Sequence, residues 1–499
     1  MLASKIFFLC VFLIYVGIVA AHNSAKGRAD DGGITDECLD ELGFWPLPSS
    51  CSVDTSSMPM FLSPSFTIEI SASSQSKLSP SENEMLQKLV ERYNKVLKPL
   101  MASKNSVPQE GLQLDHLEIS VASSIGNKGT LWPSLKDDES YELLLQSSQN
   151  ASISSSAIWG ALRGIETFSQ LFDLNTKLSK YSTIQVNDSP RFKYRGIMLD
   201  TSRHYIIIET VYALLDAMAY NKFNVLHWHI TDDQSFPIES VKYPGLANDG
   251  SFDSTYGRHV YTPSDVTSIL EYARLRGIRV VPEFDMPGHA TSWFNGYPEL
   301  MTECPDSSLK DFSKPMDVSK NSTYRFLAEL LTEMSSRFED DFFHIGGDEV
   351  DGSCWEANKD VQNFCKAHNI TSSAALQMYF EKKIVEQLVD LGKTPVIWEE
   401  NFGSLTGYPK GAVIEIWKHV WGNTTILDEI IRQGHHAIYT TPDWYLDYST
   451  NARKGSTPIP YSRRIDDSSE WQYYYKGKFF KFAYIDYCKN TNARLNPYS

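Results

Sequence analysis

The sequence is short of positive charge. Of its 499 residues, 46 are lysine or arginine and 62 are aspartate or glutamate, which gives a formal net charge of -16 at pH 7. Because contact with a phosphate backbone requires clustered cations, this balance argues against a nucleic-acid partner. Whether such an acidic chain suits a given ligand depends on the local site.

Long apolar runs are missing after the N-terminus. Residues 1–21 contain a lysine at position 5, an apolar run from Ile6 and the small residues Val19-Ala20-Ala21, a pattern typical of a cleaved signal peptide. No later run approaches the roughly 20 apolar residues of a membrane-spanning helix. We therefore expect no membrane anchor after signal removal, and a location in the secretory pathway: a vacuole, a lysosome-like compartment or the extracellular space.

Cysteine is scarce, and its spacing fits no zinc site. Of the seven cysteines, Cys10 lies in the signal, and several of the others could pair in an oxidising lumen. We assign no metal and no other cofactor. The sequence also contains N-x-S/T motifs, the acceptor sites of N-glycosylation, which agree with a secretory location. They predict glycosylation at Asn150, Asn321, Asn369 and Asn423.

The length exceeds that of one typical domain and suggests two. Residues 22–185 have the pattern of a small α+β domain. Its expected strands are 66–70, 117–121 and 141–145. Its expected helices are 81–100 and 157–172. The second helix carries one apolar stripe, and we expect Arg163 and Glu166 outside it. Nothing in this domain assembles chemistry, so we expect it to support the next domain by packing.

Residues 190–448 alternate between short apolar runs and helical segments. The runs are 196–199, 225–230, 278–284, 342–345, 394–398, 412–417 and 437–439. The helical segments include 209–220, 263–276, 324–338, 374–391 and 426–433. Each run ends in polar residues, which favours a (β/α)8 TIM barrel with its site at the C-terminal strand ends. The alternative is a doubly wound open sheet, but no GxGxxG motif follows a strand here.

The stretch 342–350, FFHIGGDEV, is central to the functional interpretation. Its apolar half fits a buried strand, and the two glycines allow the backbone to turn, so that Asp348 and Glu349 can face one site. Two carboxylates in one site can divide their roles, one holding a proton while the other stays ionised. The alternative is a solvated loop that happens to contain two acids.

Several motifs occur in order along the second half of the chain. They are RGIMLDTSRHY, AYNKFNVLHWHITDDQSFPIES, VPEFDMPGHATSW, HIGGDEV, VIWEE, EIWK and WYLDY. Together they resemble the β-N-acetylhexosaminidases of glycoside hydrolase family 20. The resemblance implies an exo-hydrolase that removes terminal non-reducing GlcNAc or GalNAc from glycans, with residues 22–185 as the companion domain of that family.

The resemblance also implies a role for individual residues. Glu349 matches the general acid/base, and Asp348 matches the carboxylate that binds the acetamido nitrogen while the acetamido oxygen attacks C1, a retaining mechanism assisted by the substrate. Asp232 and His289 match a pair behind the acid. The substrate-binding residues implied are Arg203, Trp398, Trp417, Tyr445 and Asp447.

Two further pairs of residues have an expected structural role. The resemblance implies a Cys304–Cys354 disulfide, and a second bond between Cys38 and Cys51 is a further expectation. His227 and His229 lie at alternate positions of a strand, so both should share the face opposite Trp228. We expect these histidines to be structural or to support the site, without a metal.

After Asp447 the resemblance fades. Residues 449–499 form a divergent tail without the Trp-Gly-Glu motif or the terminal helix of the family. We expect a C-terminally truncated or alternatively spliced form whose barrel lacks its eighth strand and whose activity is in question. Other functions remain open: a glycan-binding chain with little turnover, and a regulatory or assembly partner, as a homodimer or with a full-length subunit.

Overall fold

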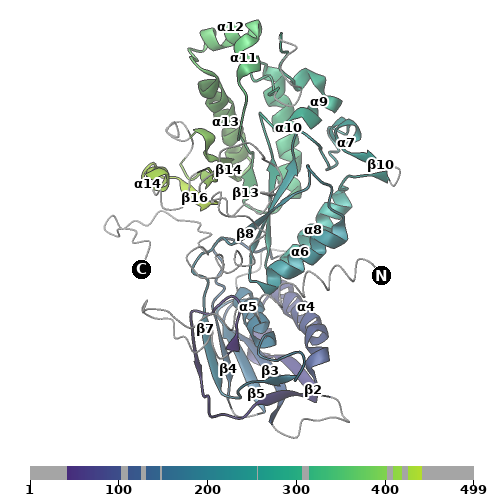
Figure 1. Cartoon of the computed structure of the whole chain (residues 1–499), viewed down its shortest axis with the longest axis vertical. Coiled ribbons are helices and arrows are strands. Elements are labelled where there is room, and N and C mark those ends of the chain that lie inside the picture. The colour runs from purple at the N-terminus through teal and green to yellow at the C-terminus, as the bar shows by residue number, and fades with distance from the viewer. Residues whose placement is uncertain are drawn as a thin grey trace, which may run out of the picture.

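The computed structural model has two parts stacked along its longest axis (Figure 1). It describes residues 42–102, 111–124, 131–146, 149–254, 257–305, 314–401, 408, 410–418 and 425–440. Within these ranges, no helix is both long and apolar enough to cross a membrane. The expected tail at 449–499 lies outside the described residues.

The smaller part is an α+β domain built on a mixed sheet. Its strands, in the sheet order β1-β7-β4-β5-β3-β2-β6, are β1 (Ser50–Val53), β7 (Ile184–Asp188), β4 (Tyr141–Leu145), β5 (Asn150–Ser155), β3 (Leu112–Val121), β2 (Met60–Ile70) and β6 (Leu178–Ser179). Its helices are α3 (Ala72–Lys77), α4 (Pro80–Leu97), η1 (Lys98–Leu100) and α5 (Ile158–Ser169). The predicted strands and helices are confirmed, whereas β1, β5, β6 and β7 were missed. Strand β5 is rich in serine, which hides its alternation.

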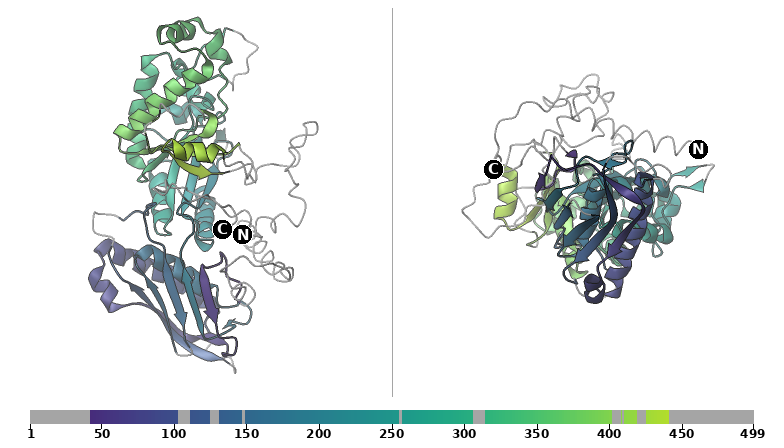
Figure 2. Two further views of the ribbon diagram at one scale, coloured as in Figure 1. Left: turned by 90° about the vertical axis from the view of Figure 1, so that its left-hand side faces the viewer. Right: turned by 90° about the horizontal axis from the view of Figure 1, so that it is seen from below.

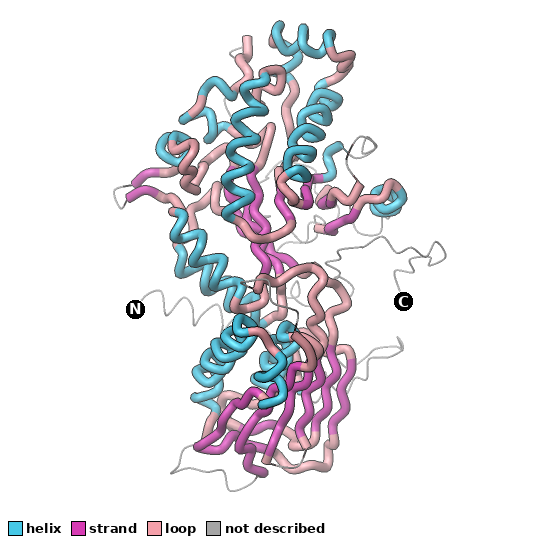
Figure 3. Tube along the Cα trace, turned by 180° about the vertical axis from the view of Figure 1, so that it is seen from behind, coloured by secondary structure: helices cyan, strands magenta, loops and turns pink. Residues whose placement is uncertain are grey.

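Helix α5 is buried on both sides, so the expectation that Arg163 and Glu166 lie outside is wrong. Both side chains are buried. Arg163 donates from Nε to Glu139 at 2.7 Å and from Nη2 to the carbonyl of Gly277, in the other domain, at 2.9 Å. The helices of the small domain lie on the side that faces the barrel (Figures 1 and 3). The polar face of α5 therefore meets protein instead of water.

The larger part contains a parallel sheet whose strands follow one another in sequence order (Figures 1 and 2). They are β8 (Gly196–Asp200), β9 (Val225–Thr231), β12 (Arg279–Phe284), β13 (Phe342–His344), β14 (Thr394–Trp398), β15 (Val413–Ile416) and β16 (His436–Tyr439). All seven predicted strands are confirmed. This order contains no reversal, so the doubly wound alternative is wrong. Among the described residues β8 and β16 are edges, which makes the sheet an incomplete TIM barrel.

Helices and short strands fill the connections. They are α6 (Ile208–Tyr220), α7 (Gly245–Gly250), β10 (Asp253–Ser254), β11 (Gly257–Arg258), α8 (Pro263–Arg274), α9 (Thr291–Gly296), η2 (Pro298–Leu300), α10 (Asn321–Arg337), α11 (Ser353–Ala357), α12 (Lys359–Ala367), α13 (Ser373–Asp390), η4 (Glu399–Asn401) and α14 (Thr425–Arg432). The five predicted helices correspond to α6, α8, α10, α13 and α14. Their apolar faces cover the outer face of the sheet, where Trp228 packs edge-on against Tyr261.

The inward-facing side chains form layers, as in other barrels. The lowest layer is apolar and consists of Tyr194, Val225, Val281, Phe342, Val396, Val413 and Ile438. Because side chains two residues apart share a face, the residues two positions further along each strand form the next layer. That second layer is polar and includes His227, Glu283, His344 and Glu415, all buried. The apolar layer lies toward the N-terminal ends of the strands, and the polar layer lies nearer the C-terminal strand ends.

Candidate active site

The acid loop, residues 345–350, carries two carboxylates that turn toward one histidine. Gly346 and Gly347 have φ values of 67° and 98°, and Glu349 itself has a φ of 51°. The predicted turn is confirmed, and it brings Asp348 Oδ2 and Glu349 Oε2 to 3.5 and 3.7 Å from the same atom, Nε2 of His289. A positive φ at a residue other than glycine is uncommon and marks a conformation that the surroundings impose.

Gly346 has no room for a side chain. An added Cβ would lie 1.8 Å from Oδ1 of Asp285, the same oxygen that accepts the N–H of Gly347 at 3.0 Å. We expect Gly346→Ala to lower the free energy of unfolding by about 3 kcal/mol, since backbone strain contributes roughly 1 to 2 kcal/mol and overpacking at least as much. Urea denaturation measures the loss.

Gly392 provides the matched control for this substitution. Its φ of 78° imposes a similar backbone strain, but nothing lies within 4 Å of its Cβ position. Gly392→Ala should therefore cost only the strain, roughly 1 to 2 kcal/mol. If Gly346→Ala and Gly392→Ala lose the same free energy of unfolding, the acid loop accommodates the added methyl group by a small movement, and the packing argument is wrong.

His289 links the acid loop to a buried carboxylate. Its Nδ1 lies 3.2 Å from Oδ1 of Asp232, while its buried Nε2 has no hydrogen-bond partner within the described part of the chain. Burial by itself would lower the pKa of His289, but Asp232 and Asp348 together raise it to about 9. An imidazolium at this place directs its free N–H toward Asp348 and Glu349.

Asp285 is a member of the site that the motif analysis did not select. Burial, and then the charge of Asp348, raise the pKa of Asp285 well above its usual value. Oδ1 of Asp285 accepts the N–H of Gly347, whereas its Oδ2 and Oδ1 of Asp348 have no hydrogen-bond partner among the described residues. The position of Asp285 at the end of β12, four residues before His289, was the available signal.

Arg203 lies three residues after the end of β8, and its side chain reaches Asp232, the carboxylate that also contacts His289. Its Nη1 lies 2.9 Å from Oδ2 of Asp200, and its Nη2 lies 2.6 Å from Oδ2 of Asp232. The side chain is 42% exposed. Since a guanidinium has five N–H donors, some remain available to a ligand.

Trp398 and Trp417 meet at nearly a right angle. Their ring centroids are 6.5 Å apart and their planes differ by 70°. Trp398 is buried and donates its indole N–H to Glu283 at 2.9 Å, and it packs beside the ring of His344. Trp417 is half-buried and donates to Glu400 at 3.1 Å. Trp417 is therefore the more accessible ring, while much of Trp398 contributes to the core.

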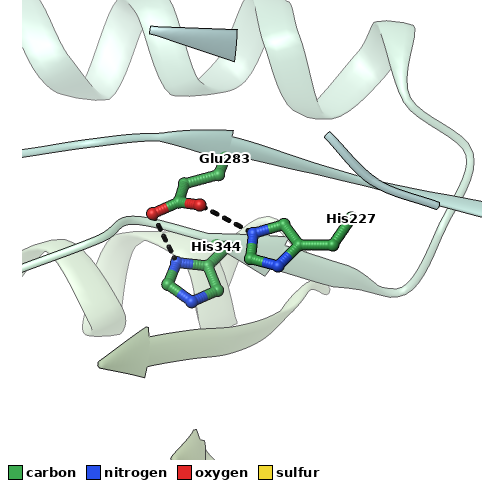
Figure 4. A group of neighbouring side chains, drawn as sticks. All are labelled: His227, Glu283 and His344. Carbon is green, nitrogen blue, oxygen red and sulfur yellow. Dashed lines mark hydrogen bonds and ion pairs between the residues drawn. The ribbon is translucent and has the colours of Figure 1, made fainter. Parts of the chain in front are cut away.

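His227 and His344 flank Glu283 inside the barrel (Figure 4). His227 Nε2 lies 2.6 Å from Oε2 of Glu283, and His344 Nδ1 lies 3.4 Å from Oε1. These three residues could offer ligand atoms to a metal ion. However, Glu415 and Glu283 raise the pKa of His227 to about 9 against the effect of burial. His227 and Glu283 already form a close ion pair at 2.6 Å, and we assign no metal here.

The expectation about His227 and His229 is confirmed in its geometry. Both residues face the interior and lie close to Glu283, whereas Trp228 packs on the opposite side against Tyr261 and Phe338. Strand alternation was sufficient to predict this arrangement.

The predicted disulfide Cys304–Cys354 is present and connects the chain after η2 to the start of α11, close to the acid loop. Cys51 is also disulfide-bonded, but its expected partner Cys38 lies outside the described residues. Cys365 is a buried free thiol.

Several predicted residues cannot be compared with the structure. Tyr445, Asp447 and Asn423 lie outside the described residues. The other predicted glycosylation positions, Asn150, Asn321 and Asn369, are exposed. Exposure is a condition for glycosylation, so these three stay predictions.

A parallel barrel with two carboxylates at its C-terminal strand ends is an arrangement that suits a glycoside hydrolase. The chain belongs to glycosyl hydrolase family 20. The model of the family's catalytic domain matches residues 192–484, and a second model, described as beta-acetyl hexosaminidase like, matches residues 44–171.

Comparison with similar proteins supports the assignment to this family. Beta-hexosaminidase subunit beta of Rattus norvegicus is 38% identical over 448 residues, which cover 88% of this chain and 77% of that protein. The human subunit beta is 39% identical over 375 residues, covering 74% and 62%. A Flavobacterium johnsoniae chitobiase structure has a TM-score of 0.66 at 29% identity, covering 81% of this chain and 59% of that one. The chain thus spans less than two thirds of the human subunit and of the chitobiase.

Proposed function

We propose that this chain is an exo-β-N-acetylhexosaminidase that releases terminal non-reducing GlcNAc and GalNAc by substrate-assisted, retaining hydrolysis. The observation that carries the proposal is the approach of Asp348 and Glu349, at 3.5 and 3.7 Å, to Nε2 of His289. Its second support is the similarity to beta-hexosaminidase subunits.

In the first step Glu349 donates a proton to the glycosidic oxygen as the bond between that oxygen and C1 breaks. Asp348 accepts a hydrogen bond from the acetamido N–H and thereby directs the acetamido oxygen to C1, where it forms the new bond. The product is an oxazolinium ion, whose positive charge the carboxylate of Asp348 stabilises. In the second step Glu349 takes a proton from water, which attacks C1 and reopens the ring, so the β configuration is retained.

The exposed Glu349 side chain, 59% accessible, fits a group that must reach both a leaving group and water. The N–H on Nε2 of His289 faces both acids and can donate to one of them at a time. The separations of 3.5 and 3.7 Å exceed ordinary hydrogen bonds, and catalytic contacts of this kind often tighten when substrate binds.

The sugar itself would be held by Arg203, through donors that Asp200 and Asp232 leave available, and by the aromatic faces of Trp417 and Trp398. We extend the proposal to Tyr445 as a donor to the acetamido oxygen. Asp447 would bind the outer hydroxyls and favour neutral sugars over sulfated or sialylated ones.

The test compares aryl glycosides that differ only at C2. We expect hydrolysis of aryl 2-acetamido-2-deoxy-β-glucoside and β-galactoside, and at least about 10³-fold slower hydrolysis of the β-glucoside, because the intramolecular nucleophile is absent. NMR of the first-formed product should show the β anomer. Equal rates on the 2-acetamido-2-deoxy-β-glucoside and the β-glucoside would refute the substrate-assisted mechanism. Binding on a glycan array without turnover would favour the glycan-binding alternative.

The proposed environment is the secretory pathway or a lysosome-like compartment, with a glycan as substrate. Relatives named as subunits alpha and beta support assembly with a second hexosaminidase chain. Light scattering of the purified chain, alone and with such a subunit, would measure this association.

A further inference from the structure

Another histidine, His229, lies between two buried carboxylates behind the acid loop. Its Nδ1 is 2.8 Å from Oε2 of Glu283 and its Nε2 is 2.9 Å from Oδ2 of Asp232. The side chain is 5% exposed and those of its two partners 0 and 1%. The contact arises from register, because Glu283 on β12 lies opposite His229 on β9.

Each ring nitrogen of His229 faces a carboxylate oxygen, so the doubly protonated ring is the form that fits this place. A neutral ring would turn one bare nitrogen lone pair toward a carboxylate oxygen in a buried place, where such a repulsive contact is costly. Nη1 of Arg203 also lies 3.1 Å from Nε2, and one of its two N–H groups is used by Asp200 at 2.9 Å. The other N–H would need a bare Nε2 as acceptor, and that bare nitrogen would then face Oδ2 of Asp232 at 2.9 Å. Burial opposes the charge, yet Glu283 and Asp232 raise the pKa of His229 well above its usual value.

Asp232 is consequently held by two cations on one oxygen. Oδ2 faces Nη2 of Arg203 at 2.6 Å and Nε2 of His229 at 2.9 Å. Oδ1 accepts the N–H of Asp233 at 2.6 Å and faces Nδ1 of His289 at 3.2 Å. The other titratable groups around Asp232 and its histidine partners are Asp200, Asp233, Asp285, His227, His344, Asp348 and Glu349.

We propose that His229, backed by Glu283, is a positioning residue for the acid pair. As a permanent imidazolium it keeps Asp232 ionised and aimed at His289, and it thereby keeps the proton on His289 Nε2 that faces Asp348 and Glu349. A buried line of four side chains, Glu283, His229, Asp232 and His289, then connects the barrel interior with the acid loop. The catalytic consequence rests on the proposed function.

His227 offers a matched control for His229. It lies two residues earlier on the same strand and face, it is equally buried, and it also contacts Glu283, at 2.6 Å. Its other nitrogen, however, faces Glu415 at 3.7 Å and not Asp232. Substitution by asparagine therefore removes a similar core side chain at both positions but breaks the line to Asp232 only in His229→Asn.

The first measurement is the pH dependence of hydrolysis of an aryl 2-acetamido-2-deoxy-β-glucoside by the full chain. Asp232 has a depressed pKa because of its cationic partners, so losing one of them raises that pKa and lets Asp232 take up a proton at a higher pH. In His229→Asn we expect the acidic limb of kcat/KM to move up by about one pH unit or more and kcat to fall about tenfold. KM should change little.

His227→Asn should leave the shape of the pH profile unchanged, although both variants lose thermal stability. The same shift in both variants, or none in His229→Asn, would overturn the proposal, because a merely structural role does not distinguish them. A parent chain that hydrolyses nothing would instead refute the proposed function.

A second measurement decides the charge of His229 without any activity. In protein labelled with ¹⁵N-histidine, the ring signals lost in His229→Asn identify this residue. We expect two protonated nitrogens from pH 5 to pH 8. A neutral tautomer with one bare nitrogen at neutral pH would overturn the proposal, whether or not the chain is an enzyme.

Discussion

Glu349→Gln should lower kcat on a β-linked GlcNAc disaccharide by on the order of 10³-fold and leave substrate affinity within a few-fold. The substitution preserves the size of the side chain but removes the proton, and a positioned general acid contributes about 10²- to 10⁴-fold. The loss should be smaller on a 4-nitrophenyl glycoside, whose leaving group departs without protonation. Steady-state kinetics on both substrates, with binding to the variant measured by calorimetry, tests this prediction.

Glu356→Gln makes the same chemical change seven residues later, on the exposed surface of α11, and should stay within twofold of the parent. Activity of Glu349→Gln within tenfold of the parent on the disaccharide would contradict its assignment as the acid. An equal loss on the two substrates would contradict the protonation step, since only the sugar leaving group depends on it.

The strands and the turn of the acid loop follow from local sequence. Each predicted barrel strand is a short apolar run that ends in a polar residue, and neighbouring runs pair in parallel in the structure. The glycines in HIGGDEV predict a turn, which the structure realises with a positive φ at Glu349 as well as at Gly346 and Gly347. The geometry of one stretch was thus sufficient to bring both acids to one site.

The partners of the inward-facing polar residues could not be predicted in this way. Glu283 lies within an apolar run, which indicated only a buried strand. Its contacts with His229 and His344 depend on the register between strands that are more than 50 residues apart in sequence. Register is a property of the assembled sheet, so no local pattern specifies it.

The error at helix α5 has a related cause. Helical periodicity assigns polar side chains to water because most helices have one solvated face. At α5 both faces meet protein, and the polar side becomes a buried junction in which Arg163 pairs with Glu139. Burial by itself would raise the pKa of Glu139, but Arg163 and Arg195 lower it to about 2. Only the position of the second domain could have revealed that the polar side of α5 is buried.

Asp348→Asn should impair a different step from that of Glu349→Gln. The asparagine keeps the size of the side chain but not its charge, so the oxazolinium ion loses its counter-charge. Electrostatic groups of this kind contribute about 10²- to 10³-fold to kcat, and we expect a loss of that order on both the disaccharide and the 4-nitrophenyl glycoside. Equal loss on the two substrates distinguishes this variant from Glu349→Gln, because Asp348 acts on the nucleophile and not on the leaving group.

A stable thiazoline mimic of the intermediate tests the same role without turnover. Its affinity should fall at least about tenfold in Asp348→Asn, since the mimic presents the group that Asp348 holds, while the affinity for free GlcNAc should change less. Asp351→Asn is the matched control: Asp351 is exposed and accepts the N–H of Ser353 at 2.9 Å, a contact that asparagine can also make. Unchanged inhibition of Asp348→Asn by the thiazoline would show that this carboxylate does not bind the acetamido group. The close approach of Asp348 to His289 would then serve only to shape the acid loop.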